Sequence, residues 1–127
     1  MFSINYENKQ DIIIVRFNGS LTSDTIKAIK SDVISKEDNS KSYIFDLEKL
    51  ELLDSAGLSY IINCLKITMK NNTQIKLLNL INQPKIVFEI TRVDSLFEIY
   101  KNEVEALNSF NKEKDNESSN TSMQQRA

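Results

Sequence analysis

One stretch of the sequence joins an apolar run to an amphipathic helix, and it limits the folds that the chain can adopt. Residues 43–47, YIFDL, are almost wholly apolar and are typical of a short buried strand. A short turn through residues 48–49 leads to the loop 52–58, LLDSAGL. The next segment, from residue 55 or 56 to about residue 71, has the spacing of a helix with one apolar face, formed by Leu58, Ile61, Ile62, Leu65 and Met69. A buried strand that runs through a loop into such a helix is the repeating unit of α/β folds.

Strand and helix patterns alternate along the rest of the chain. Alternating or β-branched runs predict strands at residues 3–7, 12–17, 74–80 and 96–100, and Asn18-Gly19 is expected to end the second of them. Apolar spacing predicts helices over residues 23–36, from Pro84 to about residue 91, and over 103–110. Their inward-facing residues are expected to be Ile26, Ile29, Val33, Ile34, Ile86, Val87, Ile90, Val104, Leu107 and Phe110. The sequence therefore predicts an α/β fold: a mixed sheet of four to five strands with helices packed against it and an opening antiparallel β-hairpin.

The composition excludes several classes of function. The 127 residues include no histidine and one cysteine, which removes the commonest general base, a Ser-His-Asp triad and most zinc sites. The formal net charge is −2, so the chain has no overall basic field for nucleic acid or an anionic membrane. Cys64 is expected to be a small buried apolar residue.

The last residues differ in composition from the rest of the chain. From residue 111 onward the sequence is rich in Asn, Lys, Glu, Ser and Gln, so residues 1–110 are expected to form one domain and residues 111–127 a disordered polar tail. The sequence resembles neither a signal peptide nor a membrane span, and a cytoplasmic protein is the expectation.

The loop before the central helix contains the candidate functional residues. Asp54 and Ser55 are both good N-cap residues, because either side-chain oxygen can accept from free N–H groups of the first helical turn. Gly57 has no side chain, so another molecule could approach the backbone closely there. A phosphoryl group on Ser55 would be tolerated by the helix dipole and repelled by Asp54. From the residue types alone, capping is the better interpretation of Ser55.

Five segments, in this order and at this spacing, resemble the STAS domain. The likeness covers residues 3–110 and is closest to the stand-alone bacterial anti-sigma factor antagonists. It rests on FNGSLT at 17–22, YIFDL at 43–47, LDSAGL at 53–58, IKLLN at 75–79 and LFEIY at 96–100. The sequence also departs from the family pattern at two places. Thr22 stands where the family often has an acidic residue, with Asp24 two positions later, and Ala56 stands where a second serine often follows.

The resemblance implies a regulatory function through protein binding. In the family, the serine that matches Ser55 is phosphorylated by a serine kinase of the histidine-kinase-like ATPase class, which is also the anti-sigma factor. The unphosphorylated antagonist binds this partner and releases the sigma factor. The phosphorylated form does not bind productively, and a serine phosphatase returns it to the unphosphorylated form. ATP belongs to the partner's site, so this chain is expected to hold no cofactor or metal, to catalyse no reaction and to contact neither nucleic acid nor membrane directly. The implied partner-binding residues are Thr22, Asp24, Asp54, Ser55, Ala56, Gly57, Leu58 and Ser59.

One other function of a STAS domain stays open at this point. The chain would then be an accessory subunit of a lipid-transport ATPase or of another assembly, and it would bind without phosphate chemistry. The retained Asp-Ser-x-Gly loop favours the phosphorylated antagonist.

Overall fold

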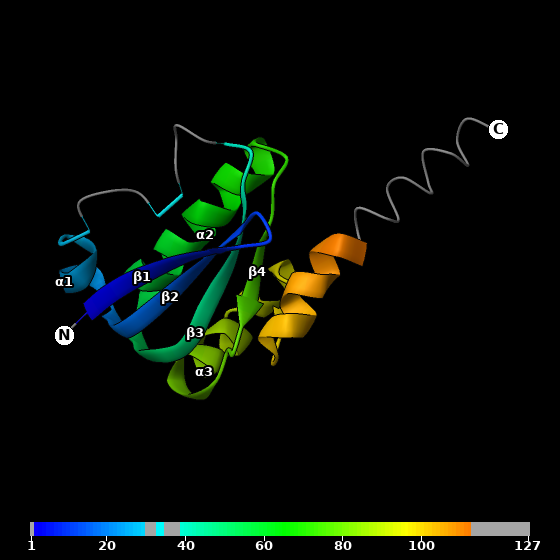
Figure 1. Cartoon of the computed structure of the whole chain (residues 1–127). Helices are drawn as coiled ribbons and strands as arrows, with labels where there is room; N and C mark the ends of the chain where they lie inside the picture. Colours follow the sequence, from blue (N-terminus) through cyan, green and yellow to red (C-terminus); the bar gives the residue numbers. More distant parts are fainter. Residues whose placement is uncertain (1, 30–32, 35–38, 113–127) are drawn as a thin grey trace, which may run out of the picture.

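The computed structural model describes residues 2–29, 33–34 and 39–112 of the chain. Strands and helices alternate as the sequence predicts (Figure 1). The elements are β1 (Phe2–Lys9), β2 (Ile12–Leu21), α1 (Ser23–Ile26), β3 (Ser42–Leu53), α2 (Ser55–Lys70), β4 (Ile75–Leu78), α3 (Asn82–Ile90), the 3-10 helix η1 (Val93–Leu96), β5 (Ile99–Tyr100) and a last helix of which residues 103–112 are described.

The five strands form one mixed sheet in the order β1-β2-β3-β4-β5. β1 and β2 form the predicted antiparallel hairpin, and β2, β3, β4 and β5 are parallel to one another. The hairpin turn has Gln10 at φ 53° and Asp11 at φ 68°. Positive φ at both residues of a two-residue turn matches the twist of the strands that it joins. The predicted mixed sheet with an opening hairpin is therefore confirmed.

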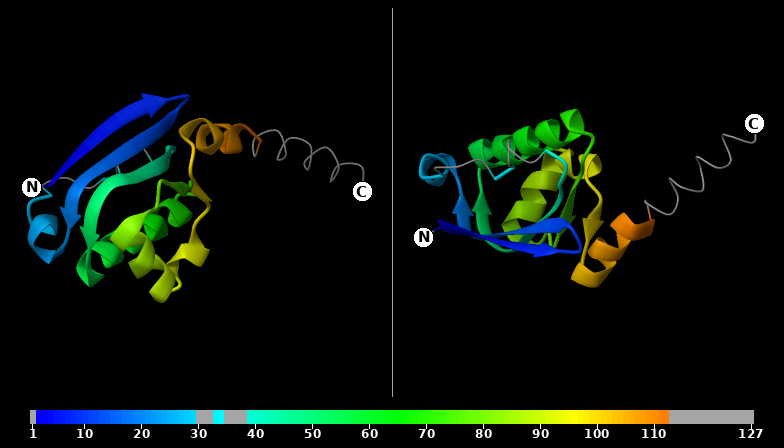
Figure 2. Two further views of the ribbon diagram at one scale, coloured as in Figure 1. Left: turned by 90° about the horizontal axis from the view of Figure 1, so that it is seen from below. Right: turned by 45° about the horizontal axis from the view of Figure 1, so that its top comes forward.

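The two faces of the sheet carry separate apolar clusters. The larger cluster joins the strands to α2 and α3 and includes Phe17 and Phe45, whose rings meet edge to face with centroids 5.1 Å apart. The smaller cluster lies under the last helix and consists of Ile12, Ile14, Ile44, Leu78, Ala106 and Leu107. The last helix thus lies apart from α2 and α3, on the other side of the sheet (Figure 2).

The predicted helix over residues 23–36 is wrong beyond its first turn. α1 ends at Ile26, and residues 27–28 form a turn. Val33 and Ile34 are buried as the apolar spacing suggested, but the Val33 N–H donates to the Tyr60 hydroxyl at 3.3 Å instead of to a helical carbonyl. Residues 30–32 and 35–36 of this prediction lie outside the described residues.

Two strands are longer than predicted. β2 does not end at Asn18-Gly19 but continues to Leu21. It stays paired with β3 across two register irregularities, between Arg16 and Asn18 and between Gly19 and Ser20. β3 continues through residues 48–49, where a turn was expected, to Leu53. These extensions place the ends of β2 and β3 side by side, directly before α1 and α2.

The predicted inward faces of the helices are confirmed only in part. Leu58 and Ile61 on α2 and Leu107 on the last helix are buried as predicted, and so is Cys64. Met69, Ile86, Ile90 and Val104 are exposed, whereas Thr68 on α2, Pro84 and Phe88 on α3 and Ala106 on the last helix are also buried. In α3 the buried face is set by Phe88, which packs edge to face on Phe97 with ring centroids 6.0 Å apart. The last helix includes Asn111 and Lys112, which were assigned to the polar tail, and residues 113–127 lie outside the described residues.

Gly57 sets how closely the start of α2 approaches the end of β2. A Cβ atom at this position would lie 2.1 Å from the Leu21 carbonyl oxygen and 2.8 Å from the Leu53 Cδ1 atom. The oxygen belongs to the backbone and cannot move aside as a flexible side chain would. The close approach expected at Gly57 is therefore made by this chain's own backbone and not by another molecule.

We predict that Gly57→Ala will lower the free energy of unfolding by about 3 kcal/mol or more, because a core contact would be overpacked. Urea unfolding at neutral pH measures the change. Ser59→Ala, at an exposed position in the same helix, should change stability by no more than about 0.5 kcal/mol. Equal effects of the two substitutions on stability would contradict the close packing of Gly57 against the Leu21 carbonyl.

Candidate functional site

Asp54 is the N-cap residue of α2 and links that helix to α1. Its Oδ1 accepts from the Gly57 N–H at 2.8 Å, and its Oδ2 accepts from the Ser23 N–H at 3.0 Å. Its own N–H donates to the Leu21 carbonyl at 3.4 Å. One short side chain thus satisfies an otherwise unpaired donor in each of two helices, and it fixes the end of β2 against the start of α2.

Ser55 is the first residue of α2, and its side chain is exposed. Because Asp54 provides the cap, the Ser55 hydroxyl is not needed for it, which resolves the choice between the two candidates. Within the described part of the chain the Ser55 side chain makes no hydrogen bond. The loop therefore presents a hydroxyl group to solvent at the positive end of a 16-residue helix.

Gln83 of α3 holds the same loop from the other side. Its Oε1 accepts from the Leu53 N–H at 2.8 Å, and its Nε2 donates to the Leu53 carbonyl at 3.0 Å. Leu53 is two residues before Ser55, so β2, α1 and α3 together fix the position of the hydroxyl. This contact could not be predicted from the sequence, because Gln83 is an ordinary polar residue near a predicted helix start.

The structure brings the implied partner-binding residues to one end of the molecule but does not expose all of them. Ser55, Ser59 and Asp24 are exposed, and Thr22, Asp54 and Ala56 are partly buried. Gly57 and Leu58 are buried, and Leu58 is only 6 % exposed. Gly57 and Leu58 therefore shape the loop from inside the fold, and their expected direct contact with a partner is corrected.

The site is electrostatically asymmetric. Hydrogen bonds from the backbone N–H groups of Gly57 and Ser23 stabilise the ionised carboxylate and hold the pKa of Asp54 below its usual range. A negative charge therefore stands next to the Ser55 hydroxyl at neutral pH. The Asp54 carboxylate also lies at the N-terminus of α2, where the helix dipole favours an anion.

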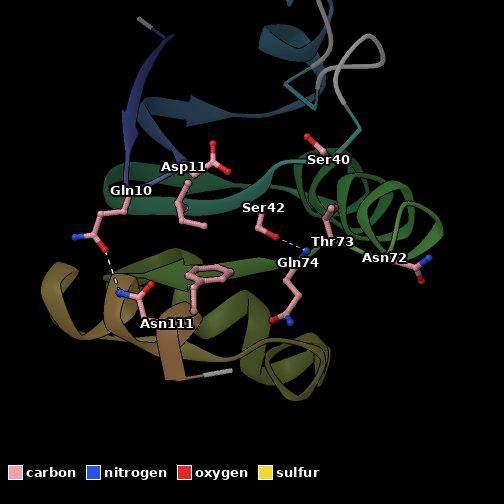
Figure 3. A pocket seen from close by; sticks show the side chains of 10 residues that line it. Gln10, Asp11, Ser40, Ser42, Asn72, Thr73, Gln74 and Asn111 are labelled. Carbon is pink, nitrogen blue, oxygen red and sulfur yellow. Dashed lines mark hydrogen bonds between the residues drawn. The ribbon is translucent and has the colours of Figure 1, made fainter. Parts of the chain in front are cut away.

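A polar hollow of about 260 Å³ lies at the opposite end of the sheet, where β2 and β3 begin (Figure 3). Its lining consists of amide and hydroxyl side chains with Ile12, Phe110 and one carboxylate, Asp11, which is bound by Lys41. Asn111 donates to Gln10 across its rim at 3.3 Å. Among the described residues that line the hollow, Asp11 is the only ionisable side chain, so they offer no acid–base pair.

The described residues contain no cluster of three or more His, Cys, Asp or Glu side chains able to hold a metal ion. None of the helices that the structure describes has the length and apolar character needed to span a membrane.

Comparison with protein families gives a match over most of the chain. The family description that matches is "STAS domain", and it covers residues 3–106. The chain belongs to the STAS-domain family. The match includes Asp54, the whole of α2 and all five strands except Phe2, the first residue of β1.

Solved structures of STAS proteins share the fold. A proposed anti-sigma factor antagonist from Thermotoga maritima superposes with a TM-score of 0.75 at 23% identity, over 84% of this chain and 92% of that one. The antagonist SpoIIAA in its unphosphorylated form gives a TM-score of 0.71 at 17% identity, over 87% of this chain and 96% of that one. Bacillus SpoIIAA in its phosphorylated form gives a TM-score of 0.61 at 19% identity, over 87% of this chain and 99% of that one. The chain therefore has the fold of a complete STAS domain, with a mixed five-stranded sheet.

The Asp54 cap predicts a specific dependence of stability on pH. The folded-state pKa of Asp54 is lowered, so its contribution to stability is present above the unfolded value of about 3.9 and is lost as pH falls through the folded value. Asp54→Asn should therefore lower the melting temperature at neutral pH, and the difference from the unsubstituted chain should shrink below about pH 4. Thermal melts across that pH range measure it.

Asp24→Asn is the matched control for this prediction. Asp24 is exposed and makes no side-chain hydrogen bond within the described residues. Its substitution should lower the melting temperature at neutral pH far less than Asp54→Asn does. A pH-independent effect of Asp54→Asn would show that the carboxylate charge is not what stabilises the loop.

Proposed function

We propose that this chain is an anti-sigma factor antagonist that is switched off by phosphorylation of Ser55. Its partner would be an anti-sigma factor that is also a serine kinase of the histidine-kinase-like ATPase class. The unphosphorylated chain binds this partner in the cytoplasm and frees the sigma factor, so it regulates transcription indirectly. A serine phosphatase returns the phosphorylated chain to the binding form.

The observation that carries the proposal is the exposed Ser55 hydroxyl on a loop held rigid by other residues. Asp54 provides the helix cap and Gln83 fixes the backbone of Leu53. Ser55 is therefore free to react without loss of a structural contact. Two of the structures that share this fold show SpoIIAA in unphosphorylated and phosphorylated forms. This supports phosphorylation as the switch in the present chain.

Phosphoryl transfer requires only an acceptor from this chain. The Ser55 oxygen attacks the γ-phosphorus of ATP, the bond to the β-phosphate oxygen breaks, ADP leaves, and the hydroxyl proton passes to a base of the kinase. The exposed position at the first residue of α2 gives a kinase access to the hydroxyl. All catalytic groups belong to the partner.

The product carries enough charge to change binding. A phosphoserine adds about −1.5 to −2 charges beside the Asp54 carboxylate, which stays ionised because its pKa is lowered. The dipole of α2 lessens the cost of this charge inside the chain. In a complex, the same charge would face the nucleotide phosphates of the kinase, and like charges opposed across an interface cost several kcal/mol. Repulsion at a rigid loop is therefore sufficient for the switch.

We predict that Ser55→Ala will bind the kinase as the unmodified chain does and will accept no phosphate from ATP. Ser55→Asp should bind at least about tenfold more weakly, because even one added charge faces the partner's phosphates. Isothermal titration calorimetry with the purified kinase and a non-hydrolysable ATP analogue measures both affinities.

Asn63→Asp serves as the control, because Asn63 is an exposed residue of α2 about two turns beyond Ser55 and is not among the implied partner-binding residues. It adds the same charge to the chain and should weaken binding much less than Ser55→Asp. If Ser55→Asp bound as tightly as Ser55→Ala, repulsion at Ser55 could not be the switch.

A further inference from the structure

The last helix is attached to the sheet by less apolar contact than α2 is. Of its described residues, Ala106 and Leu107 are buried, whereas Val104 is 64 % exposed. α2 buries five residues, of which Leu58, Ile61 and Cys64 belong to the larger cluster. Since apolar burial scales with the area removed from water, it holds the last helix more weakly than α2.

Ion pairs hold the first turn of the last helix. Glu103 Oε1 lies 2.9 Å from Arg16 Nη1, and Glu103 Oε2 lies 2.7 Å from Lys9 Nζ. Arg16 also pairs with Asp46 at 2.7 Å and with Glu7 at 2.6 Å. The side chains of Lys9, Arg16 and Glu103 are 40, 30 and 27 % exposed, so dissolved salt can screen these pairs. We call the contact of Glu103 with Arg16 and Lys9 the Glu103 clasp.

A buried lysine lies beneath the other end of the same helix. The Lys76 side chain on β4 is 1 % exposed. Its ammonium donates to the Ser109 hydroxyl at 2.8 Å and lies 4.3 Å from the centre of the Phe110 ring, and both residues belong to the last helix. The Tyr100 ring centre is 5.8 Å away and Glu98 Oε1 is 3.6 Å away, and the Glu98 side chain is 54 % exposed. Docking of the helix thus takes a positive charge out of water, and removing a charge from water is costly even when partners are present.

We propose that the last helix is a cover that can detach from the sheet. Two opposed charge effects set the balance between its docked (closed) and detached (open) states. The Glu103 clasp favours the closed state, and rehydration of Lys76 favours the open state. Opening uncovers the apolar side chains of Ile12, Ile14, Ile44 and Leu78. The larger cluster contains no residue of the last helix, so the rest of the domain keeps its core when the cover opens. Higher ionic strength weakens the clasp and shifts the cover toward the open state.

Amide hydrogen exchange of the full chain, followed by NMR, tests the effect of the clasp. The N–H of Ala106, which donates to the Asn102 carbonyl at 3.0 Å, reports on the cover, and the N–H groups in the middle of α2 report on the domain core. In the unsubstituted chain the cover amides should exchange at least about tenfold faster than those of α2. The ratio of the cover exchange rate to the α2 exchange rate should rise when salt is raised from about 0.05 M to about 0.5 M. Glu103→Gln should raise this ratio at low salt and remove most of the salt dependence of the ratio.

Glu105→Gln is the matched control, since it makes the same change on an exposed residue of the same helix. It should leave the ratio and its salt dependence unchanged. The proposal is overturned if the cover amides exchange at the same rate as the α2 amides at both salt concentrations. Equal effects of Glu103→Gln and Glu105→Gln would overturn it as well.

Lys76→Met tests the opposed charge effect. Methionine keeps an unbranched apolar side chain under Phe110 and removes the buried charge, so the cover amides should exchange several-fold more slowly. Lys101→Met, at an exposed position, should have no such effect. Faster exchange in Lys76→Met would show that the ammonium holds the helix closed, which contradicts the proposal. The Glu103→Gln comparison remains decisive if Lys76→Met does not fold.

Discussion

The carboxylate of Asp54 accepts hydrogen bonds from two helices at once, at 2.8 Å from the Gly57 N–H and 3.0 Å from the Ser23 N–H. This contact exists only because β2 and β3 end side by side and because Gly57 lets the backbone of α2 approach the Leu21 carbonyl. The exposure of Ser55, the charge beside it and the rigidity of the loop all follow from it. A residue that caps a helix for structural reasons thereby leaves its neighbour free for chemistry.

The two faces of the sheet have different roles in the domain. One face carries the larger apolar cluster with α2 and α3, which fix the Ser55 loop through Asp54 and Gln83. The other face carries a small cluster under a helix whose first turn is held by the ion pairs of Glu103. A rigid site on one side and a weakly held cover on the other can coexist because the clusters share no residue.

Hydrophobic pattern was enough to predict the sheet, because the run at residues 12–17 is rich in β-branched residues and the run at 43–47 is short and almost wholly apolar. It could not predict that α1 ends at Ile26, since apolar residues at helical spacing can be buried without being part of one helix. The site was located from the Asp-Ser-x-Gly loop, but the residue types could not decide whether Asp54 or Ser55 forms the cap. The contact of Gln83 with Leu53 joins residues thirty positions apart and leaves no local pattern in the sequence.

The central claim is that Ser55 carries a regulatory phosphate. Phosphosite mapping by mass spectrometry on the protein isolated from its own cells, under growth and under stress, tests it most directly. The account predicts a phosphoryl group on Ser55 in a fraction that changes with conditions, together with a co-purifying serine kinase. A Ser55 that stays unmodified under every condition would contradict the account, and a binding role without phosphate chemistry would replace it.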